Sequence, residues 1–287
     1  MKTITTSKEL QHTIDELRLR RRSIGLVPTM GFLHDGHLSL VRTAKLENDI
    51  VVTTIFVNPL QFSESEDLAT YPQDIERDTQ LASEAGTDFL FTPSHEEMFR
   101  ENVLTSISVT EISSALEGAS RPTHFAGVAT IVAKLFNIVG NCSAYFGEKD
   151  WQQLQVIKRM AIDLSYRVEV KGCPIVRDSD GLALSSRNVY LTKNQRSEAA
   201  NIPKTLLKAH EMIRDGERGS NNIKQAVLTH FKKSPEIEVD YVELVNGETL
   251  QVIDQIDERT RLLVAVKIGT ARLIDNMNAL KGPSIGT

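Results

Sequence analysis

Short apolar runs alternate with amphipathic stretches over the first 176 residues of the chain. Strands are predicted at residues 24–27, 50–56, 89–91, 144–146 and 168–170. Helices are predicted at residues 37–47, 74–85, 127–139 and 151–164, where apolar positions recur at helical spacing. Such alternation is typical of parallel βαβ units with right-handed crossovers. The pattern therefore predicts an α/β fold with a doubly wound parallel sheet, whose ligands bind beyond the carboxyl ends of the strands.

The pattern changes after about Arg187, where helices are followed by strands instead of alternating with them. The helices are predicted at residues 194–214 and 221–232, and the strands at residues 238–245 and 262–266. Between the two helices, residues 215–220 carry glycine and polar residues that mark a break. This order indicates a second, smaller α+β domain with an antiparallel sheet, so we expect domains at 1–176 and 177–287.

Composition narrows the class of protein. A chain of 287 residues can bury a large core, and a net charge of −5 gives no general attraction for a polyanion, so no nucleic-acid partner is expected. Lys134 interrupts the longest apolar run, and residues 1–11 have no apolar signal region, so no membrane partner is expected. Cys142 and Cys173 lack metal-ligand spacing. We expect a cytoplasmic protein with buried thiols and no metal bound by the chain itself.

The most distinctive segment is 28–37, Pro-Thr-Met-Gly-Phe-Leu-His-Asp-Gly-His, which joins the first predicted strand to a helix. Gly31 and Gly36 permit positive φ and close approach to a ligand, and a helix start offers free N–H groups to a phosphate. His34 and His37 lie about one turn apart and can face the same group. The alternative is that one histidine caps the helix and the other is a core residue with its hydrogen bonds satisfied. The pair with its glycines favours binding and cleavage of a nucleoside triphosphate.

Polar residues also follow the second predicted strand. Asn58 and Gln61 carry amides that both donate and accept, which suits a hydroxy-carboxylate. An ordinary Asn-Pro turn explains the same residues equally well. Arg121 and His124 lie shortly before the helix predicted from Gly127, and they are secondary candidates for the same site.

Two further segments carry cations and hydroxyls. Residues 147–150, Gly-Glu-Lys-Asp, repeat the strand, glycine and helix pattern, with Lys149 placed to neutralise phosphate and Asp150 to cap a helix. Residues 184–187, Leu-Ser-Ser-Arg, place two hydroxyls beside a guanidinium, a set that can hold a triphosphate. A solvated lysine and a surface loop with incidental serines are the alternatives.

Residues 34–37 form an H-x-G-H motif, which resembles the signature of the nucleotidyltransferase superfamily that includes class I aminoacyl-tRNA synthetases. Together with residues 58–61, 147–150 and 184–187, in this order along nearly the whole chain, the sequence resembles the pantothenate synthetase (pantoate–β-alanine ligase) family. The resemblance implies a Rossmann-like domain that binds nucleotide and pantoate. It also implies a smaller domain that closes over the active site, with the phosphate-binding loop 184–187 at the junction.

Site residues follow from the resemblance position by position. It implies catalytic roles for His37, His34 and Lys149. The implied ATP-binding residues are Met30, Gly31, Phe32, Leu33, His34, Asp35, Gly36, His37, Gly147, Glu148, Lys149, Asp150, Val176, Leu184, Ser185, Ser186 and Arg187. The implied residues for pantoate and β-alanine are Gln61, Gln153, Asn58 and Arg121. The chain departs from the usual family pattern at Phe32, at Trp151 and in residues 99–102.

The implied reaction is the ATP-dependent condensation of (R)-pantoate with β-alanine, through a pantoyl-adenylate and with release of AMP and pyrophosphate. The resemblance further implies Mg²⁺ held mainly through the phosphates, and a homodimer. Two other functions stay open. One is a nucleotidyl transferase that releases a stable nucleotidylated product, and the other is a nucleotide-binding regulatory protein without turnover.

Overall fold

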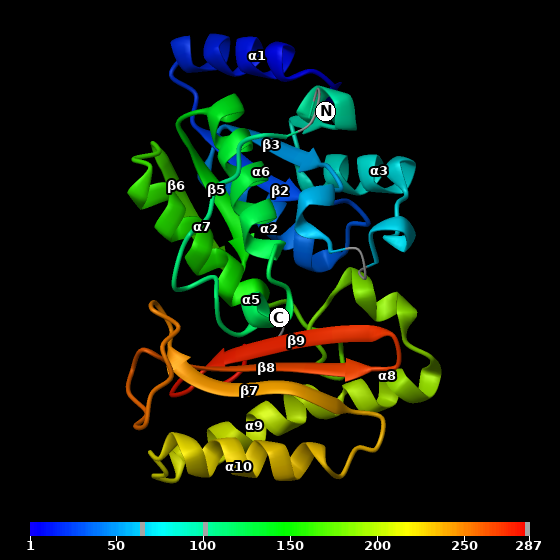
Figure 1. Ribbon diagram of the computed structural model, residues 1–287. Coiled ribbons are helices and arrows are strands. Elements are labelled where there is room, and N and C mark those ends of the chain that lie inside the picture. Colours follow the sequence, from blue (N-terminus) through cyan, green and yellow to red (C-terminus); the bar gives the residue numbers. More distant parts are fainter. Residues whose placement is uncertain (64–66, 100–102, 285–287) are drawn as a thin grey trace. The chain divides into compact units, whose positions relative to one another are not determined.

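The computed structural model of the chain describes residues 1–63, 67–99 and 103–284 (Figure 1). Its contacts divide the chain into two compact units. The first contains Met1–Glu148 and Gln152–Cys173, and the second contains Lys149–Trp151 and Pro174–Thr287. Three residues next to the fifth strand therefore belong with the C-terminal part of the chain. In the segment 99–102, where the sequence departs from the family pattern, residues 100–102 lie outside the described residues.

A six-stranded sheet forms the centre of the first unit, and all of its strand pairs are parallel. Its strands are β1 (Lys2–Ile4), β2 (Ile24–Thr29), β3 (Ile50–Ile55), β4 (Phe89–Phe91), β5 (Cys142–Gly147) and β6 (Val168–Cys173). The spatial order is β1-β4-β3-β2-β5-β6. All five predicted strands are confirmed, and only the short edge strand β1 escaped prediction. The order reverses between β2 and β5, so the loops after these two strands flank the topological switch point, where ligands bind in such sheets.

Helices lie on both faces of this sheet, which confirms the doubly wound class. They are α1 (Ser7–Leu19), α2 (Asp35–Glu47), α3 (Ile75–Ala85), α4 (His95–Met98), α5 (Glu117–Ser120), α6 (His124–Val139) and α7 (Trp151–Asp163). Short 3-10 turns are η1 (Pro59–Gln61), η2 (Asp67–Thr70) and η3 (Glu148–Asp150). The crossovers β2-α2-β3 and β5-α7-β6 run in opposite directions across the sheet, so the right-handed rule places α2 and α7 on opposite faces.

Alternating strand residues supply the core on both faces. Val27 and Leu90 pack with residues of α2 and α3, and the neighbouring strand residues Leu26 and Phe91 are equally buried and point the other way. Helix α1 escaped prediction because only a few of its residues are buried. The predicted starts of α2 and α6 are too late, since these helices begin at Asp35 and His124.

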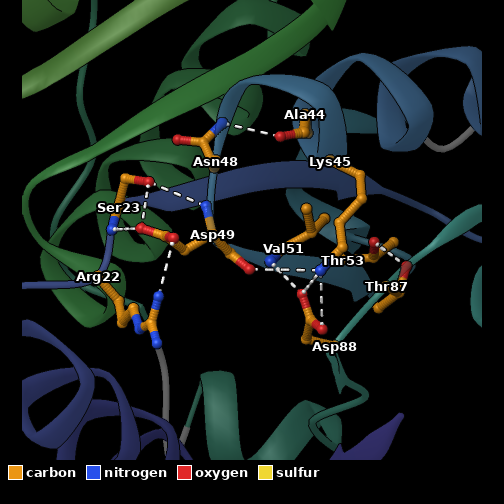
Figure 2. Close-up of polar contacts among 10 residues, drawn as sticks. All are labelled: Arg22, Ser23, Ala44, Lys45, Asn48, Asp49, Val51, Thr53, Thr87 and Asp88. Atoms are coloured by element: carbon orange, nitrogen blue, oxygen red, sulfur yellow. Dashed lines mark hydrogen bonds and ion pairs between the residues drawn. The ribbon is translucent and has the colours of Figure 1, made fainter. Parts of the chain in front are cut away.

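Carboxylates close the amino ends of the central strands (Figure 2). Asp49 accepts the N–H of Ser23 at 2.9 Å, and Asp88 accepts the N–H of Val51 and the ammonium of Lys45, both at 2.8 Å. Hydrogen bonds from Ser23 hold the pKa of Asp49 below its ordinary value. These side chains accept hydrogen bonds from N–H groups at the starts of the strands. The loops of the candidate site lie at the opposite, carboxyl edge of the sheet, where all the parallel strands end.

The second unit is built on an antiparallel sheet, β7 (Glu238–Asn246), β8 (Thr260–Ile268) and β9 (Ala271–Asn278), in that spatial order. Helices α9 (Asn201–Arg214) and α10 (Ser220–Phe231) lie side by side along it (Figure 1). The core between them includes Leu206, Ile213, Ile223, Val227, Phe231, Leu262 and Val264. This architecture confirms the predicted small α+β domain, although β9 was not predicted.

The prediction of a single helix at 194–214 is wrong. The structure has two helices there, α8 (Lys193–Ala199) and α9, and a 3-10 turn η4 (Ser186–Tyr190) precedes them. Pro203 has no N–H with which to continue the hydrogen-bond ladder from the preceding turn, so a new helix begins instead.

Both cysteines are buried, as predicted. Burial raises the pKa of Cys142 to about 12 and that of Cys173 to about 11, so neither thiol supplies a thiolate near neutral pH. Within the described ranges, no group of three or more His, Cys, Asp or Glu side chains is arranged to hold a metal ion. The helices of these ranges include none that is both long and apolar enough to cross a membrane.

Candidate active site

The loop after β2 has an unusual backbone. Gly31 has φ +85° and Phe32 has φ +50°, both in the left-handed region. A Cβ at Gly31 would lie 3.0 Å from both Asp78 Oδ2 and Ile55 Cγ2, so glycine suits this position through both its φ and its close packing. At Phe32 the left-handed conformation costs roughly 1–2 kcal/mol, so contacts must hold the loop in this shape.

Asp78 on α3 provides those contacts. Its two carboxylate oxygens accept the N–H of Phe32 at 2.6 Å and the N–H of Leu33 at 2.7 Å, and its side chain is only 1% exposed. Burial raises the pKa of Asp78, and the two N–H groups oppose this rise. Asp78 is not among the site residues predicted from the sequence. Its signal was available, because Asp78, Ala82 and Ala85 recur at helical spacing on the buried face of α3.

His34 and His37 form a reciprocal cap at the start of α2. His34 Nδ1 accepts the N–H of Gly36 at 3.1 Å, and His37 Nδ1 accepts the N–H of His34 at 3.4 Å. The two rings have centroids 4.0 Å apart and are inclined by 33°. The alternative prediction was therefore correct for His34 as a cap, but His37 is only half-buried and is not a core residue.

The cap determines which nitrogen of each ring carries hydrogen. A nitrogen that accepts a hydrogen bond is unprotonated, so in the neutral rings of His34 and His37 the hydrogen lies on Nε2. The start of α2 thus offers two ring N–H donors beside the positive end of a helix dipole. That combination suits the oxygens of a phosphate.

Asn58 and Gln61 form a buried amide pair at the carboxyl end of β3. Asn58 Nδ2 donates to Gln61 Oε1 and to Gly127 O, both at 3.1 Å, and Gln61 Nε2 donates to Met30 Sδ at 2.8 Å. A Cβ at Gly127 would lie 2.1 Å from Leu60 O, so glycine lets α6 approach this turn. Through the contact between Met30 and Gln61, the candidate phosphate loop and the candidate carboxylate site adjoin within one unit.

Arg121 and His124 converge on the backbone of the same turn. His124 Nδ1 donates to Gln61 O at 2.9 Å, Arg121 Nη2 donates to Gln61 O at 3.3 Å, and Arg121 Nη1 donates to His124 Nε2 at 3.2 Å. Since a guanidinium can only donate, His124 accepts at Nε2 and carries its hydrogen on Nδ1. Both secondary candidates therefore lie at the Asn58–Gln61 turn.

Gln153 is half-buried on α7, in the same unit, and its side chain makes no hydrogen bond within the described part of the chain. Its neighbour Gln152 differs, because it is buried and its amide donates to Ile112 O and Ala115 O at 2.8 Å. The structure does not join Gln153 to Gln61 by a contact between described side chains, but it leaves the amide of Gln153 available to a ligand.

The segment 147–150 is divided between the units. Gly147 ends β5 and Glu148 follows it in the first unit, whereas Lys149 and Asp150 belong to the second. Lys149 Nζ lies 3.5 Å from Asp150 Oδ1, and the Lys149 side chain is 20% exposed. The backbone carbonyl of Lys149 accepts Asn276 Nδ2 at 2.9 Å. Lys149 is thus placed by the C-terminal sheet.

Residues 176–187 fold back on themselves as a tight turn in the second unit. The N–H of Leu184 donates to Val176 O at 3.0 Å, so these two predicted ATP-binding residues are paired. Beyond the turn, Ser185 Oγ accepts the N–H of Arg187 at 3.3 Å and caps η4. Ser186 is buried at the start of that 3-10 turn.

Arg196 on α8 binds two carboxylates of this turn. Arg196 Nη2 lies 2.8 Å from Asp178 Oδ2 and 2.9 Å from Asp180 Oδ1, and Nη1 also donates to Asp180. A hydrogen bond from the N–H of Ser179 and, as a smaller effect, one from Arg196 hold the pKa of Asp178 below its ordinary 3.8. The hydrogen bond from Arg196 does the same for Asp180.

Replacing Arg196 by glutamine is expected to destabilise the protein by at most about 1 kcal/mol, because the pairs are partly exposed. Both carboxylates have lowered pKa values in the folded state, so their contribution is present above pH 3.8 and is lost as the pH falls through the folded values. Urea unfolding of wild type and variant along a pH series measures this difference. A difference that stayed constant below pH 3.8 would contradict it, and Arg159→Gln, at a surface pair on α7, is the control.

Comparison with known proteins identifies the family. The sequence profile of the Pantoate-beta-alanine ligase family matches residues 2–278. The pantothenate synthetase of Thermotoga neapolitana is 48% identical over 276 residues, which cover 96% of this chain and 99% of that protein. The pantothenate synthetase of a Sulfurihydrogenibium species is 49% identical over 278 residues, with 96% and 99% covered.

Solved structures agree with the sequence matches. The pantothenate synthetase of Thermus thermophilus superposes with a TM-score of 0.93 and 45% identity, covering 97% of this chain and 99% of that one. A pantoate-beta-alanine ligase of Francisella tularensis, complexed with beta-gamma ATP and beta-alanine, has a TM-score of 0.80 and 34% identity, with 99% and 100% covered. This chain belongs to the pantoate–beta-alanine ligase family.

Proposed function

We propose that the protein is an ATP-dependent ligase that condenses (R)-pantoate with β-alanine to pantothenate through a pantoyl-adenylate. The observation that carries this proposal is the hydrogen bond between Gln61 and Met30. It places a buried amide pair, suited to a hydroxy-carboxylate, against the loop that leads to His34 and His37. Adenylate formation needs this adjacency, because the carboxylate must reach the α-phosphate.

The first step joins a carboxylate oxygen of pantoate to the α-phosphorus and breaks the bond to the β-phosphate oxygen, which releases pyrophosphate. The nucleophile is already ionised, so the step needs donors for the growing charge more than a strong base. His34 and His37 provide Nε2–H donors for the α-phosphate oxygens. The amides of Gln61 and Gln153, with Arg121, orient the pantoate, and Asn58 holds the Gln61 amide in place by donating to its Oε1.

The second step forms the amide. The amine of β-alanine attacks the acyl carbon of the adenylate, the bond from that carbon to the phosphate oxygen breaks, and AMP leaves while the nitrogen loses a proton.

The C-terminal part of the chain acts on the phosphates and on solvent access. The outer phosphates are held during the first step by Lys149, Ser185, Ser186 and Arg187. We assign the smaller domain, 177–287, to closure over the site, which protects the mixed anhydride from water.

The side chains and backbone of the phosphate-binding segments fit a phosphate better than a metal ion. Ring N–H groups, hydroxyls, Lys149 and Arg187 complement phosphate oxygens, and the described residues include no cluster suited to hold a metal. We therefore propose that Mg²⁺ enters on the triphosphate, held by phosphate oxygens and water, and assign it no ligand from the chain. A homodimer, implied by the family resemblance, and a cytoplasmic location, expected from the composition and the apolar pattern, complete the proposal.

The test is exchange of labelled pyrophosphate into ATP before any β-alanine is added. We expect exchange with pantoate present and none without it, because the adenylate step is reversible and needs the carboxylate. A nucleotidyl transferase would instead accumulate a stable nucleotidylated product that added β-alanine does not convert to an amide and AMP. ATP binding with no exchange for any carboxylate would indicate a regulatory protein, and either result would refute the ligase.

A further inference from the structure

Two neighbouring residues of β9 connect both phosphate-binding segments of the second unit. We propose that Asn276 and Asp275 are positioning residues, which hold Lys149 and the loop 184–187 at fixed places on one sheet so that both engage the triphosphate together. This inference rests on the proposed function, and it adds residues to which neither the motifs nor the comparisons assign a role.

Asn276 fixes the Lys149 side of the connection. It is 2% exposed, its Nδ2 donates to Lys149 O at 2.9 Å, and its Oδ1 accepts Arg261 Nε at 2.7 Å. One end of the amide must donate and the other must accept, so its orientation is determined. The carbonyl of Lys149 is thereby tied to the strands β8 and β9.

Trp151 fastens the other end of the same short segment. The guanidinium carbon of Arg261 lies 3.3 Å from the centroid of the Trp151 ring. The indole N–H donates to Gly247 O at 2.7 Å, just beyond β7. Side chains from the C-terminal sheet thus hold both ends of the segment that contains Lys149, which explains why Lys149–Trp151 groups with the second unit.

Asp275 fixes the base of the 184–187 loop. Its carboxylate binds Arg177 through two parallel hydrogen bonds, of 2.6 Å from Nη1 and 2.9 Å from Nη2, and the two side chains are 1% and 4% exposed. Arg177 Nη1 also donates to Gly181 O at 3.0 Å, and Arg177 pairs with Ala183 across the turn. The chain enters the loop directly after this clamp.

One peptide unit joins the two sides. The N–H of Asn276 donates to Asp275 Oδ1 at 2.7 Å, so the carboxylate that holds Arg177 also holds the residue that binds the carbonyl of Lys149. A buried ion pair adds little net stability compared with apolar residues of similar size. The two parallel hydrogen bonds between Arg177 and Asp275 do, however, fix the relative geometry of the two side chains. Geometry is what a triphosphate requires, because cations at fixed separations bind its oxygens without a further ordering cost.

The first test compares Asn276→Asp and Asp275→Asn with wild type in pantoate-dependent pyrophosphate exchange. Asn276→Asp replaces the donor to Lys149 O with an acceptor of equal size, and Asp275→Asn removes one acceptor from Arg177. Each variant is expected to raise the KM for ATP at least about tenfold. The KM for pantoate, whose proposed ligands lie in the first unit, should change by less than about twofold.

Glu243→Gln is the matched control. Glu243 on β7 accepts Lys224 Nζ of α10 at 2.7 Å, so this variant also removes a carboxylate charge from an ion pair of the second unit. It should leave both KM values unchanged. Arg177→Lys keeps the buried positive charge but cannot form both parallel hydrogen bonds to Asp275. It therefore replaces Asp275→Asn if that variant does not fold.

A second readout does not depend on turnover. Trp151 is the one tryptophan in the sequence, so its emission reports directly on the segment that contains Lys149. We expect ATP to change this emission in wild type, and Asn276→Asp to need at least about ten times more ATP for the same change. If wild type shows this binding signal but no pantoate-dependent exchange, the ligase proposal fails while the positioning role is still measured by ATP affinity.

Folded variants with a lower kcat but an unchanged KM for ATP would overturn the proposal, because a role in general stability reduces the amount of active protein without weakening ATP binding. An equal rise in the two KM values would overturn it as well. Equal ATP affinity of wild type and Asn276→Asp in the emission titration would have the same meaning.

Discussion

Replacement of His37 by alanine is expected to lower pantoate-dependent pyrophosphate exchange about 10²–10³-fold, the usual effect of removing one donor to a developing oxyanion. The variant loses the Nε2–H donor and also the Nδ1 acceptor that binds the N–H of His34. Loss of this cap should cost about 1 kcal/mol of stability, which leaves the protein folded. Exchange kinetics and urea unfolding of the same preparation measure the two effects separately.

His37→Asn separates the two roles of the ring. The Oδ1 of asparagine lies near the place of Nδ1 and can accept the same N–H, but nothing in asparagine reaches the position of Nε2. We expect this variant to lose as much exchange as the alanine variant while it recovers most of the stability. His12→Ala, at an exposed position on α1, is the control for removal of an imidazole. Near-normal exchange in folded His37→Asn would show that the Nε2–H group does not stabilise the transition state.

Asp78→Asn is expected to lower exchange at least about tenfold, because a loop displaced by a fraction of an ångström misplaces the groups that bind the phosphate. One carboxylate oxygen becomes an amide NH₂, which then faces the N–H of Phe32 or Leu33. A buried N–H left without an acceptor costs about 1–3 kcal/mol, and relief of the buried charge offsets part of this loss. Urea unfolding and exchange kinetics give the two values.

Asp74→Asn is the matched control on the same helix. Asp74 caps α3 and accepts the N–H of Arg77 at 3.1 Å, and asparagine is as good a cap as aspartate. This control should therefore change stability little and exchange not at all. If Asp78→Asn destabilises the protein but retains full exchange, the carboxylate only stabilises the fold and does not shape the loop.

Local pattern was sufficient to place the main candidate segments. Alternation of strands and helices predicts a parallel sheet, and residues directly after its strands must lie at the carboxyl edge, as His34, Asn58 and Gln61 do. The close contact between Gln61 and Met30 was not predictable, because it joins side chains of two segments that lie 31 positions apart in the sequence.

Buried polar residues account for the main omissions. Asp78 belongs to a helix with charged neighbours, where a carboxylate usually faces solvent. Its spacing with Ala82 and Ala85 indicated burial, but its two partners, the N–H groups of Phe32 and Leu33, became visible only with the loop packed against it. Asp275 and Asn276 interrupt the apolar alternation of β9, and the strand was missed for that reason. The sequence also presents 147–150 as one motif, although contacts with residues about a hundred positions later divide it between the units.

The chain passes from one unit to the other at three places, after Glu148, after Trp151 and after Cys173. No single cut can therefore separate the units into two complete pieces. A fragment ending at Cys173 would carry the indole of Trp151 without its acceptor Gly247 and the carbonyl of Lys149 without its donor. Gene fusion or domain exchange at a single point would separate Lys149–Trp151 from the residues that bind it. The two units are therefore expected to be inherited as a pair.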